Sequence, residues 1–177
     1  MNYRIAEINE LERLYGFYNE IIDHQKYDDY GAAWTKDVYP SKEDLRKHLE
    51  DDLFYVMEEE GRYAGAGCIS LHEDENYLNA PWSLKLKEDE IAVLHLLAIH
   101  PDYRGKGLSK ILLKHIIEDT SGKVKAIHLD VIGGNDLAVR MYEKAGFHSI
   151  GLYEVYYEDT GNVTVNLMEY NYQKNCR

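Results

Sequence analysis

Two glycines separated by one residue, at the start of a predicted helix, mark the part of this chain best suited to bind an anion. The apolar run Ile91–Ile99 predicts a buried strand, which leads into the sequence HPDYRGKGLSKILLKHIIEDT of His100–Thr120. Because glycine has no Cβ, Gly105 and Gly107 let the backbone approach a ligand closely. The N–H groups that follow lie at a helix N-terminus, where unpaired donors and the positive end of the helix dipole favour an anion such as a pyrophosphate.

Three anion-binding patterns can be compared with this segment. A Walker-type phosphate loop requires serine or threonine where Gly107 stands, and the dinucleotide fingerprint requires glycine where Lys110 stands, so both are excluded. The pattern R-x-x-G-x-G/A is met by Arg104, Gly107 and Ser109, with serine in the last place. With LHLLAIHPDYRGKGLSKILL around it, this pattern resembles the acetyl-CoA-binding motif of the GNAT family of N-acetyltransferases. A plain glycine-bearing turn is the alternative.

A second segment, VIGGNDLAVRMYEKAGFHSIG of Val131–Gly151, resembles the other cofactor motif of that family, N-x-x-A-x-x-x-Y-x-x-x-G-F. Its places are filled by Asn135, Ala138, Tyr142, Gly146 and Phe147. Asn135 is a favourable N-cap, and Ala138 and Tyr142 share one helix face because they are four residues apart. Gly146 is suited to end the helix. The alternative for Tyr142 is an aromatic side chain packed in the core.

The elements that must position these residues alternate between strand and helix. The patterns predict strand Asn2–Ile8, helix Asn9–His24 with Asn9 as its cap, helix Ser41–Glu50, hairpin Leu53–Glu59 with Tyr63–Leu71, strand Glu90–Ile99, helix Leu108–Asp119, strand Lys125–Ile132, helix Asp136–Ala145, and hairpin Phe147–Tyr157 with Val163–Tyr170 turning at 159–162. No internal repeat or linker divides the chain, so we expect one domain, 1–177. The order resembles the full GNAT fold, an α/β fold with a mixed sheet that splays between its fourth and fifth strands.

The resemblance implies that acetyl-CoA lies in this splay. It places the pantetheine against the fourth strand and the pyrophosphate on the glycine turn. The cofactor-binding residues implied are Leu97, Ala98, Ile99, Arg104, Gly105, Lys106, Gly107, Leu108, Ser109, Asn135, Ala138 and Tyr142.

Direct transfer in this family needs an acid for the leaving thiolate and a base for the amine. Tyr142 is the expected acid, since a phenol with a pKa of ~10 is matched to a thiol with a pKa of ~8.5. Some relatives carry a glutamate base where this chain has Val93. His95, two residues on, and Asp130, on the fifth strand, are the candidates for the base. A hydrogen-bonded structural role is the alternative for each, and the base stays unassigned.

The acceptor region is expected in the aromatic loop Lys26–Pro40. Its WTKDVYP segment resembles a GNAT subgroup with a W-x-x-x-Y-P element. Trp34, Tyr39 and the more distant Trp82 could wall a pocket for an ammonium through cation–π contacts, or could simply hold loops to the core. A small primary amine is therefore the favoured acceptor. A protein or peptide acceptor, or a catalytically silent acyl-CoA sensor, remains an alternative.

Composition limits the partners. The formal net charge of −12 opposes nucleic-acid binding, which depends on clustered Lys and Arg; the acidity could attract a cationic amine or serve solubility alone. We expect no membrane span, because charged residues interrupt each apolar run, and no signal peptide.

Two cysteines, Cys68 and Cys176, make a designed disulfide unexpected and suit a reducing cytoplasm. The eight histidines are scattered without a helix-face pair, so we expect no metal. Homodimers are common in the family, although the sequence shows no interface.

Overall fold

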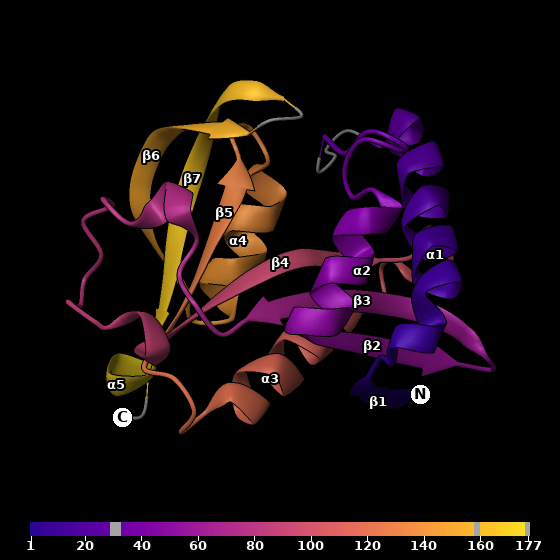
Figure 1. The fold of residues 1–177 in the computed structure, drawn as a ribbon, viewed down its shortest axis with the longest axis horizontal. Coiled ribbons are helices and arrows are strands. Elements are labelled where there is room, and N and C mark those ends of the chain that lie inside the picture. The colour runs from indigo at the N-terminus through magenta and orange to yellow at the C-terminus, as the bar shows by residue number, and fades with distance from the viewer. Residues whose placement is uncertain (29–32, 158–159, 176–177) are drawn as a thin grey trace. The chain divides into compact units, whose positions relative to one another are not determined.

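Residues 1–28, 33–157 and 160–175 are described by the computed structural model, in which helices and strands are mixed along the chain (Figure 1). The strands are β1 (Asn2–Ile5), β2 (Leu53–Glu59), β3 (Arg62–Ser70), β4 (Ile91–Ile99), β5 (Ala126–Ile132), β6 (His148–Tyr157) and β7 (Gly161–Asn171). The α-helices are α1 (Leu11–His24), α2 (Lys42–Asp51), α3 (Leu108–Thr120), α4 (Asp136–Lys144) and α5 (Tyr172–Asn175). Strand pairing follows the order β1-β2-β3-β4-β5-β7-β6, which confirms the predicted mixed α/β sheet.

The chain divides into two compact units made of alternating segments. The first contains 1–70 and 95–116, and the second contains 71–94 and 117–177. Strand β4 and helix α3 therefore each begin in one unit and end in the other. The units are described separately below.

In the first unit, β2 and β3 are buried along most of their length because both faces of the strands are covered. Alternate residues of a strand point to opposite faces. Phe54 and Val56 of β2, with Ala66 and Cys68 of β3, pack in one cluster with the apolar stripe of α1 and with Leu45 of α2. Figure 1 shows these two helices on the same side of β2 and β3.

The opposite face of β3 is shaped by Gly65 and Gly67. A Cβ added to Gly65 would lie 2.6 Å from Cδ1 of Ile99, and one added to Gly67 would lie 3.0 Å from Cδ1 of Leu97. Leu112 of α3 also comes within contact distance of the Gly65 position. The two glycines thus let the end of β4 pack closely on β3.

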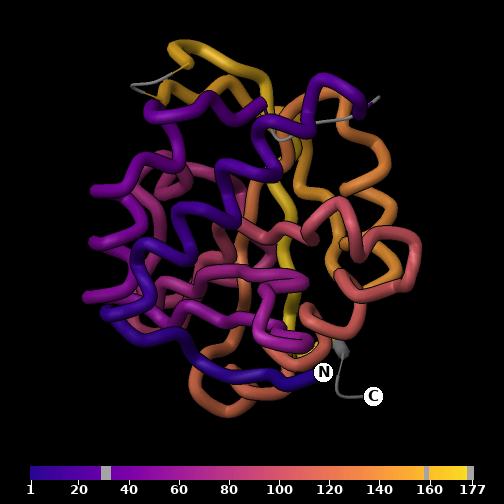
Figure 2. The backbone as a smooth tube through the Cα atoms, turned by 90° about the vertical axis from the view of Figure 1, so that its right-hand side faces the viewer, coloured from indigo at the N-terminus to yellow at the C-terminus, as the bar shows by residue number. Residues whose placement is uncertain are grey.

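The second unit is built on β5, β6 and β7. The first residues of β4 pair in parallel with β5 through three residue pairs, Ile91↔Ala126, Ala92↔Ile127 and Val93↔His128. Strand β7 pairs antiparallel with both β5 and β6, and Figure 2 shows the long β6–β7 hairpin at the yellow end of the chain. Residues 158 and 159, the second of which belongs to the predicted turn 159–162, lie outside the described residues. The predicted splay between β4 and β5 involves both units and stays a prediction.

The start of the first helix differs from the prediction. Strand β1 ends at Ile5, and a 3-10 turn over Ile8–Glu10 precedes α1, so Asn9 is not a helix cap. The Glu10 carboxylate instead accepts the N–H of Glu7 at 3.0 Å and binds Arg4 at 2.6 Å. The ion pair between Glu10 and Arg4, rather than a cap by Asn9, therefore shapes the N-terminal end of α1.

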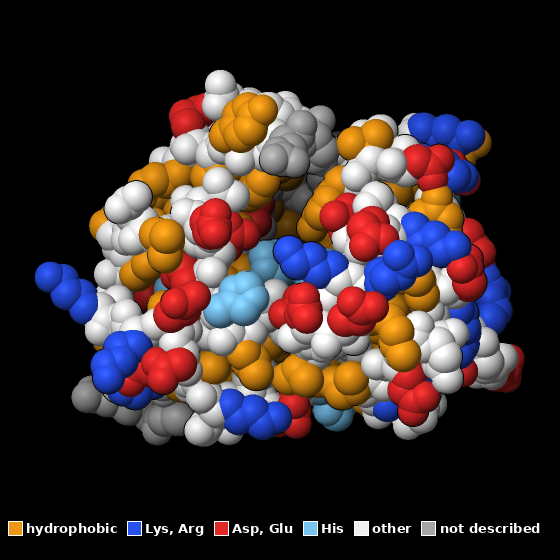
Figure 3. All heavy atoms as spheres, viewed as in Figure 1, with side chains coloured by type: hydrophobic (Ala, Val, Ile, Leu, Met, Phe, Trp, Pro, Cys, Tyr) orange, Lys and Arg blue, Asp and Glu red, His pale blue; other side chains and the backbone are white. Residues whose placement is uncertain are grey.

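The surface charge, the character of the helices and the state of the cysteines can each be described. Acidic and basic side chains are interspersed on the face drawn in Figure 3. No α-helix of 1–28, 33–157 or 160–175 combines the length and the apolar character of a membrane span. Cys68 is a buried free thiol, and Cys176 lies outside the described residues.

Candidate functional site

The turn between β4 and α3 has the backbone predicted for an anion-binding loop. Gly105 and Gly107 have φ values of +76° and +71°, in the left-handed region that side chains disfavour. A Cβ added to either glycine would meet nothing within 4 Å, so conformation rather than crowding requires glycine here. The segment 104–107 is exposed, and α3 begins at Leu108. Because Gly107 has no side chain, it cannot cap the first N–H groups of α3, and N–H groups at such a helix start suit an anionic ligand.

Arg104 is already engaged by a carboxylate. Its Nη1 lies 2.6 Å from Oδ1 of Asp28, and its Nε donates to the carbonyl of Ile99 at 3.4 Å. The Arg104 side chain is 37% exposed, whereas that of Asp28 is 14% exposed. The guanidinium is thus held beside the turn, where an anionic ligand would compete with Asp28 for it.

The end of β4 is irregular at Leu96. This residue has a φ of +56°, which is uncommon for a bulky side chain, and its carbonyl accepts a hydrogen bond from the buried Tyr18 hydroxyl at 2.7 Å. A left-handed residue breaks the regular alternation of a strand for the residues after it. Those residues, Leu97, Ala98 and Ile99, are half-buried. They are the ones predicted to pair with pantetheine.

The second motif forms a turn in which a side chain of the turn itself caps the helix that follows. After β5, the Gly133 N–H donates to the Thr164 carbonyl at 2.8 Å and Gly134 has a φ of +90°. The side chain of Asn135 accepts the N–H of Ala138 at 3.1 Å and caps α4, as predicted. At the other end, Gly146 has a φ of +101° and follows the C-cap.

Tyr142 of α4 is buried, and its ring packs on Phe147 with centroids 5.5 Å apart. Burial, and then the negative charge of Asp130, raise the pKa of Tyr142 well above its ordinary value. The phenol therefore stays protonated at neutral pH. This is the state that an acid needs, although a raised pKa also makes the phenol a weaker acid.

Asp130 is enclosed by tyrosines. Its carboxylate accepts a short hydrogen bond from the Tyr77 hydroxyl, and that hydroxyl lies 3.5 Å from the Tyr157 hydroxyl. Burial raises the pKa of Asp130, and the hydrogen bond from Tyr77 only partly opposes this. A carboxylate with a raised pKa is a stronger base, but this one is already occupied by a donor.

The other candidate base, His95, lies in the first unit beside His48. Their ring centroids are 5.6 Å apart with planes tilted by 35°. His48 in turn bonds through Nδ1 to Oδ2 of Asp52 at 2.6 Å. Val93 is fully buried in an apolar cluster of the second unit. The structure thus assigns the two candidate bases, His95 and Asp130, to different units.

The three aromatic residues predicted to line an acceptor pocket have structural contacts. Trp34 packs edge-on against Tyr18 at 5.5 Å, and both Trp34 and Tyr39 pack on the core of the first unit. Trp82 stacks flat on His128 in the second unit, with centroids 3.6 Å apart and planes at 10°. All three are half-buried, so each retains some exposed surface. Their role in binding an acceptor stays a prediction.

Sequence reasoning missed a buried charged network under Trp82. His128 lies 2.6 Å from Glu73 through Nδ1 and 3.5 Å from Glu169 through Nε2. Burial alone would lower the pKa of His128, but the bonds to Glu169 and Glu73 outweigh burial and raise it. The network joins three separate segments, and the only sequence signal would have been a histidine inside an otherwise apolar strand.

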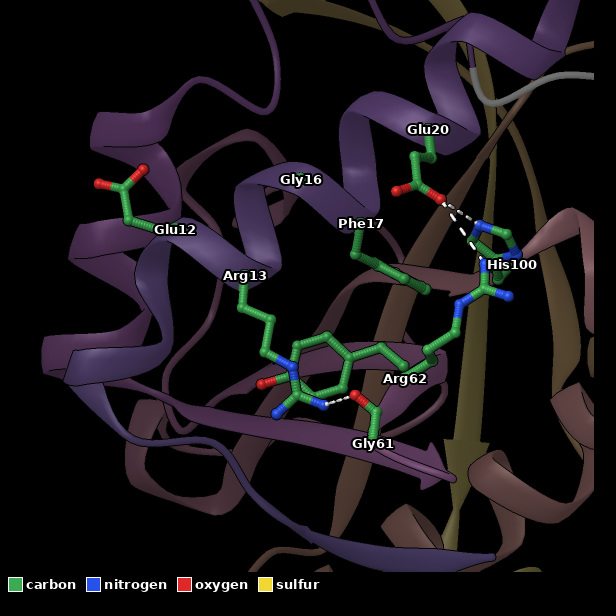
Figure 4. A pocket seen from close by; sticks show the side chains of 9 residues that line it. Glu12, Arg13, Gly16, Phe17, Glu20, Gly61, Arg62 and His100 are labelled. Carbon is green, nitrogen blue, oxygen red and sulfur yellow. Dashed lines mark hydrogen bonds and ion pairs between the residues drawn. The ribbon is translucent and has the colours of Figure 1, made fainter.

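One surface depression of about 210 Å³ is shown in Figure 4. Arg13 from α1 lies over the Tyr63 ring, 3.9 Å from its centroid, and donates to the Gly61 carbonyl at 2.7 Å. On the other side, Glu20 lies 2.7 Å from Nε2 of His100. Arg13 and Glu20 thus have partners among the lining residues, and none of the predicted site residues lines the depression.

The comparisons with known proteins agree with both motifs. A sequence model described as the acetyltransferase (GNAT) family matches residues 18–147. The [ribosomal protein bS18]-alanine N-acetyltransferase of Escherichia coli strain K12 is 34% identical over 70 residues, which cover 39% of this chain and 47% of that protein. The chain thus spans about half the length of this relative. A Bacillus subtilis protein, provisionally named for the same alanine N-acetylation, is 27% identical over 160 residues, covering 83% and 91%.

A solved structure shows the fold as a whole. A Salmonella typhimurium protein determined with its cofactor acetyl-CoA is 18% identical, with a TM-score of 0.66, and the match covers 97% of this chain and 93% of that one. At this identity, the likeness shows the fold alone.

Proposed function

Because the chain belongs to the acetyltransferase (GNAT) family, we propose that it transfers the acetyl group of acetyl-CoA to a primary amine by direct attack in a ternary complex. The observation that carries this proposal is the exposed turn before α3. Gly105 and Gly107 hold a left-handed backbone there, and the first N–H groups of the helix have no side-chain cap from Gly107. These features suit a diphosphate. The proposal draws on both units and treats 1–177 as one functional domain.

The proposed reaction is acyl transfer. The lone pair of a neutral amine attacks the thioester carbonyl, the carbon–sulfur bond breaks, and the acetyl group ends on nitrogen as an amide. The amine nitrogen loses one proton and the thiolate gains one, so the protons balance. Tyr142 is the proposed donor to sulfur, supported by a pKa that keeps its hydroxyl protonated.

The amine must reach the site without its proton. An alkylamine with a pKa of ~10.4 needs roughly 4 kcal/mol to be neutral near pH 7, so a base or a desolvating pocket is required. His95 is the better-supported candidate, since Asp130 already accepts a hydrogen bond from Tyr77. His95 itself lies beside the His48–Asp52 pair, in which a carboxylate can orient an imidazole.

Two acceptor classes follow from separate observations. The half-buried aromatic residues Trp34 and Tyr39 suit a small amine or ammonium in a narrow pocket. The relatives named for ribosomal protein alanine N-acetylation favour the α-amine of a peptide instead. We place the small amine first on the residues of this chain, with the peptide α-amine as the second candidate.

The test is acetyl-CoA-dependent thiol release across a panel of polyamines, amino acids, aminoglycosides, lysine peptides and peptides beginning with alanine. Turnover on one class names the acceptor. The Tyr142→Phe variant should reduce the rate by about 100-fold or more while acetyl-CoA affinity, measured by calorimetry, changes little.

Each other outcome has a defined meaning. Equal rates for Tyr142→Phe and wild type would refute the acid role. Binding of acetyl-CoA without turnover on any amine would favour a sensor. Absence of acetyl-CoA binding by the folded protein would overturn the proposed function itself.

A further inference from the structure

A second cluster of reactive side chains lies in the first unit, away from the glycine turn in the sequence. Helix α2 ends next to Asp52, and His48 stands four residues earlier, so the two side chains share one helix face. Strand β3 brings Cys68 to the same place. The set therefore combines an imidazole, a carboxylate and a thiol from two elements that are separated in sequence.

The donor atoms of these three residues converge. One nitrogen of His48, one oxygen of Asp52 and the sulfur of Cys68 all lie within 4.8 Å of one another. The His48 Nδ1 to Asp52 Oδ2 distance is 2.6 Å, and the Cys68 sulfur lies 3.9 Å from the same oxygen. The side chains of His48 and Asp52 are 18% and 6% exposed, and Cys68 is fully buried.

The second oxygen of the Asp52 carboxylate points to an incomplete set of contacts. Oδ1 of Asp52 is buried, and within the described residues it has no hydrogen-bond partner. The Ser70 hydroxyl also interacts with this carboxylate. A buried acceptor without a donor is costly, and a bound cation would supply what is missing.

The thiol beside it is the third ligand atom. The Cys68 sulfur is the donor toward Oδ2 of Asp52, 3.9 Å away, and the residue is fully buried. A divalent cation would replace this proton, because coordination to a divalent ion deprotonates a thiol.

We propose that His48, Asp52 and Cys68 form a binding site for a divalent transition-metal ion of the zinc class. Mixed nitrogen, oxygen and sulfur ligands of this kind are those that zinc accepts in a tetrahedral site. On binding, the Cys68 thiol loses its proton to solvent and a sulfur–metal bond forms, with no change in oxidation state. A water completes the four ligands. The site ties the end of α2 to β3 and does not depend on the proposed acetyl transfer.

Cobalt(II) is the probe that tests this site on the full chain. After dialysis against a chelator, titration with Co²⁺ should produce a thiolate-to-cobalt charge-transfer band and the visible bands of tetrahedral cobalt at one equivalent. Added Zn²⁺ should abolish both. The His48→Gln variant, at a partly exposed position, should weaken Co²⁺ binding by more than about 10-fold.

The two cysteines give a matched pair of variants. Cys68→Ser should lose the charge-transfer band, whereas Cys176→Ser, the other cysteine of the chain, should retain it. A folded wild-type protein without the band would overturn the proposal, and so would a band that survives in Cys68→Ser. If Cys68→Ser does not fold, unchanged Co²⁺ affinity in His48→Gln would still refute the site.

Discussion

The chain contains two strand-to-helix turns that begin alike and end differently. Each follows a sheet strand, each contains two glycines, and each places a glycine at positive φ. In the turn before α4, Asn135 caps the helix with its own side chain. In the turn before α3, Gly107 stands next to the helix and offers no side chain at all.

The difference teaches what separates a structural turn from a binding turn. The backbone needs glycine in both, so glycine content alone does not distinguish them. What distinguishes them is whether the first N–H groups of the helix are satisfied from within the chain. By this criterion the turn before α3 is the one suited to receive an anion.

The largest effect is expected from adding the same side chain to each turn. Gly107→Leu and Gly134→Leu both force a side chain into a left-handed conformation, at about 1–2 kcal/mol of stability each. Neither position is crowded, so the two variants are matched in strain. Only Gly107→Leu should also weaken acetyl-CoA binding, by about 10-fold or more, because its side chain lies where the phosphates are proposed to sit. Calorimetry should separate them, and equal affinities would remove the distinction between the turns.

A smaller effect is expected from removing the side-chain cap in the turn before α4. Asn135→Ala should lower the free energy of unfolding by about 1 kcal/mol, because the Ala138 N–H loses its acceptor. Denaturant titration measures this change. Asn135→Ser keeps a capping oxygen and should recover most of the loss. If the alanine variant were as stable as wild type, the cap would contribute nothing and the contrast between the turns would have to be explained differently.

The smallest effect concerns Arg104, which lies beside the turn before α3. Asp28→Asn should free Arg104 and tighten acetyl-CoA binding by about two- to five-fold, the range expected of a partly exposed ion pair. Asp102→Asn is the control. It removes the same charge two residues from Arg104, but its carboxylate pairs with Arg62 at 3.1 Å instead. Equal changes in the two variants would mean that net charge, and not release of Arg104, governs the affinity.

Features encoded by neighbouring residues were predictable from the sequence. The helix start predicted at Ser41 is confirmed, with the Ser41 hydroxyl accepting the Asp44 N–H at 3.2 Å. The Asn135 cap and the strand and helix around the glycine turn are confirmed as well. These depend on interactions within four residues, which a pattern can record.

Features that depend on distant partners were not predictable. Asn9 fails as a cap because Glu10 is drawn to Arg4 and the preceding backbone. The stacking of Trp82 on His128, and the convergence of Cys68 with His48 and Asp52, join segments far apart in the chain. The His48–Asp52 pair has the helical spacing of a metal-binding histidine pair but contains only one histidine, so the expectation of no metal did not include it. Single-sequence patterns do not contain such pairings.

The glycines of β3 have one more implication, for how the protein tolerates mutation. The backbone proposed to hold pantetheine, Leu97–Ile99, lies against Gly65 and Gly67, with no room for a methyl group at Gly65 unless the Ile99 side chain moves. A substitution there would leave every proposed ligand-binding residue intact and still press on the side chains of Leu97 and Ile99 and, from Gly65, on the Ala98 carbonyl. Variation at these two sites should therefore reach the proposed pantetheine strand indirectly, even though neither glycine belongs to a motif.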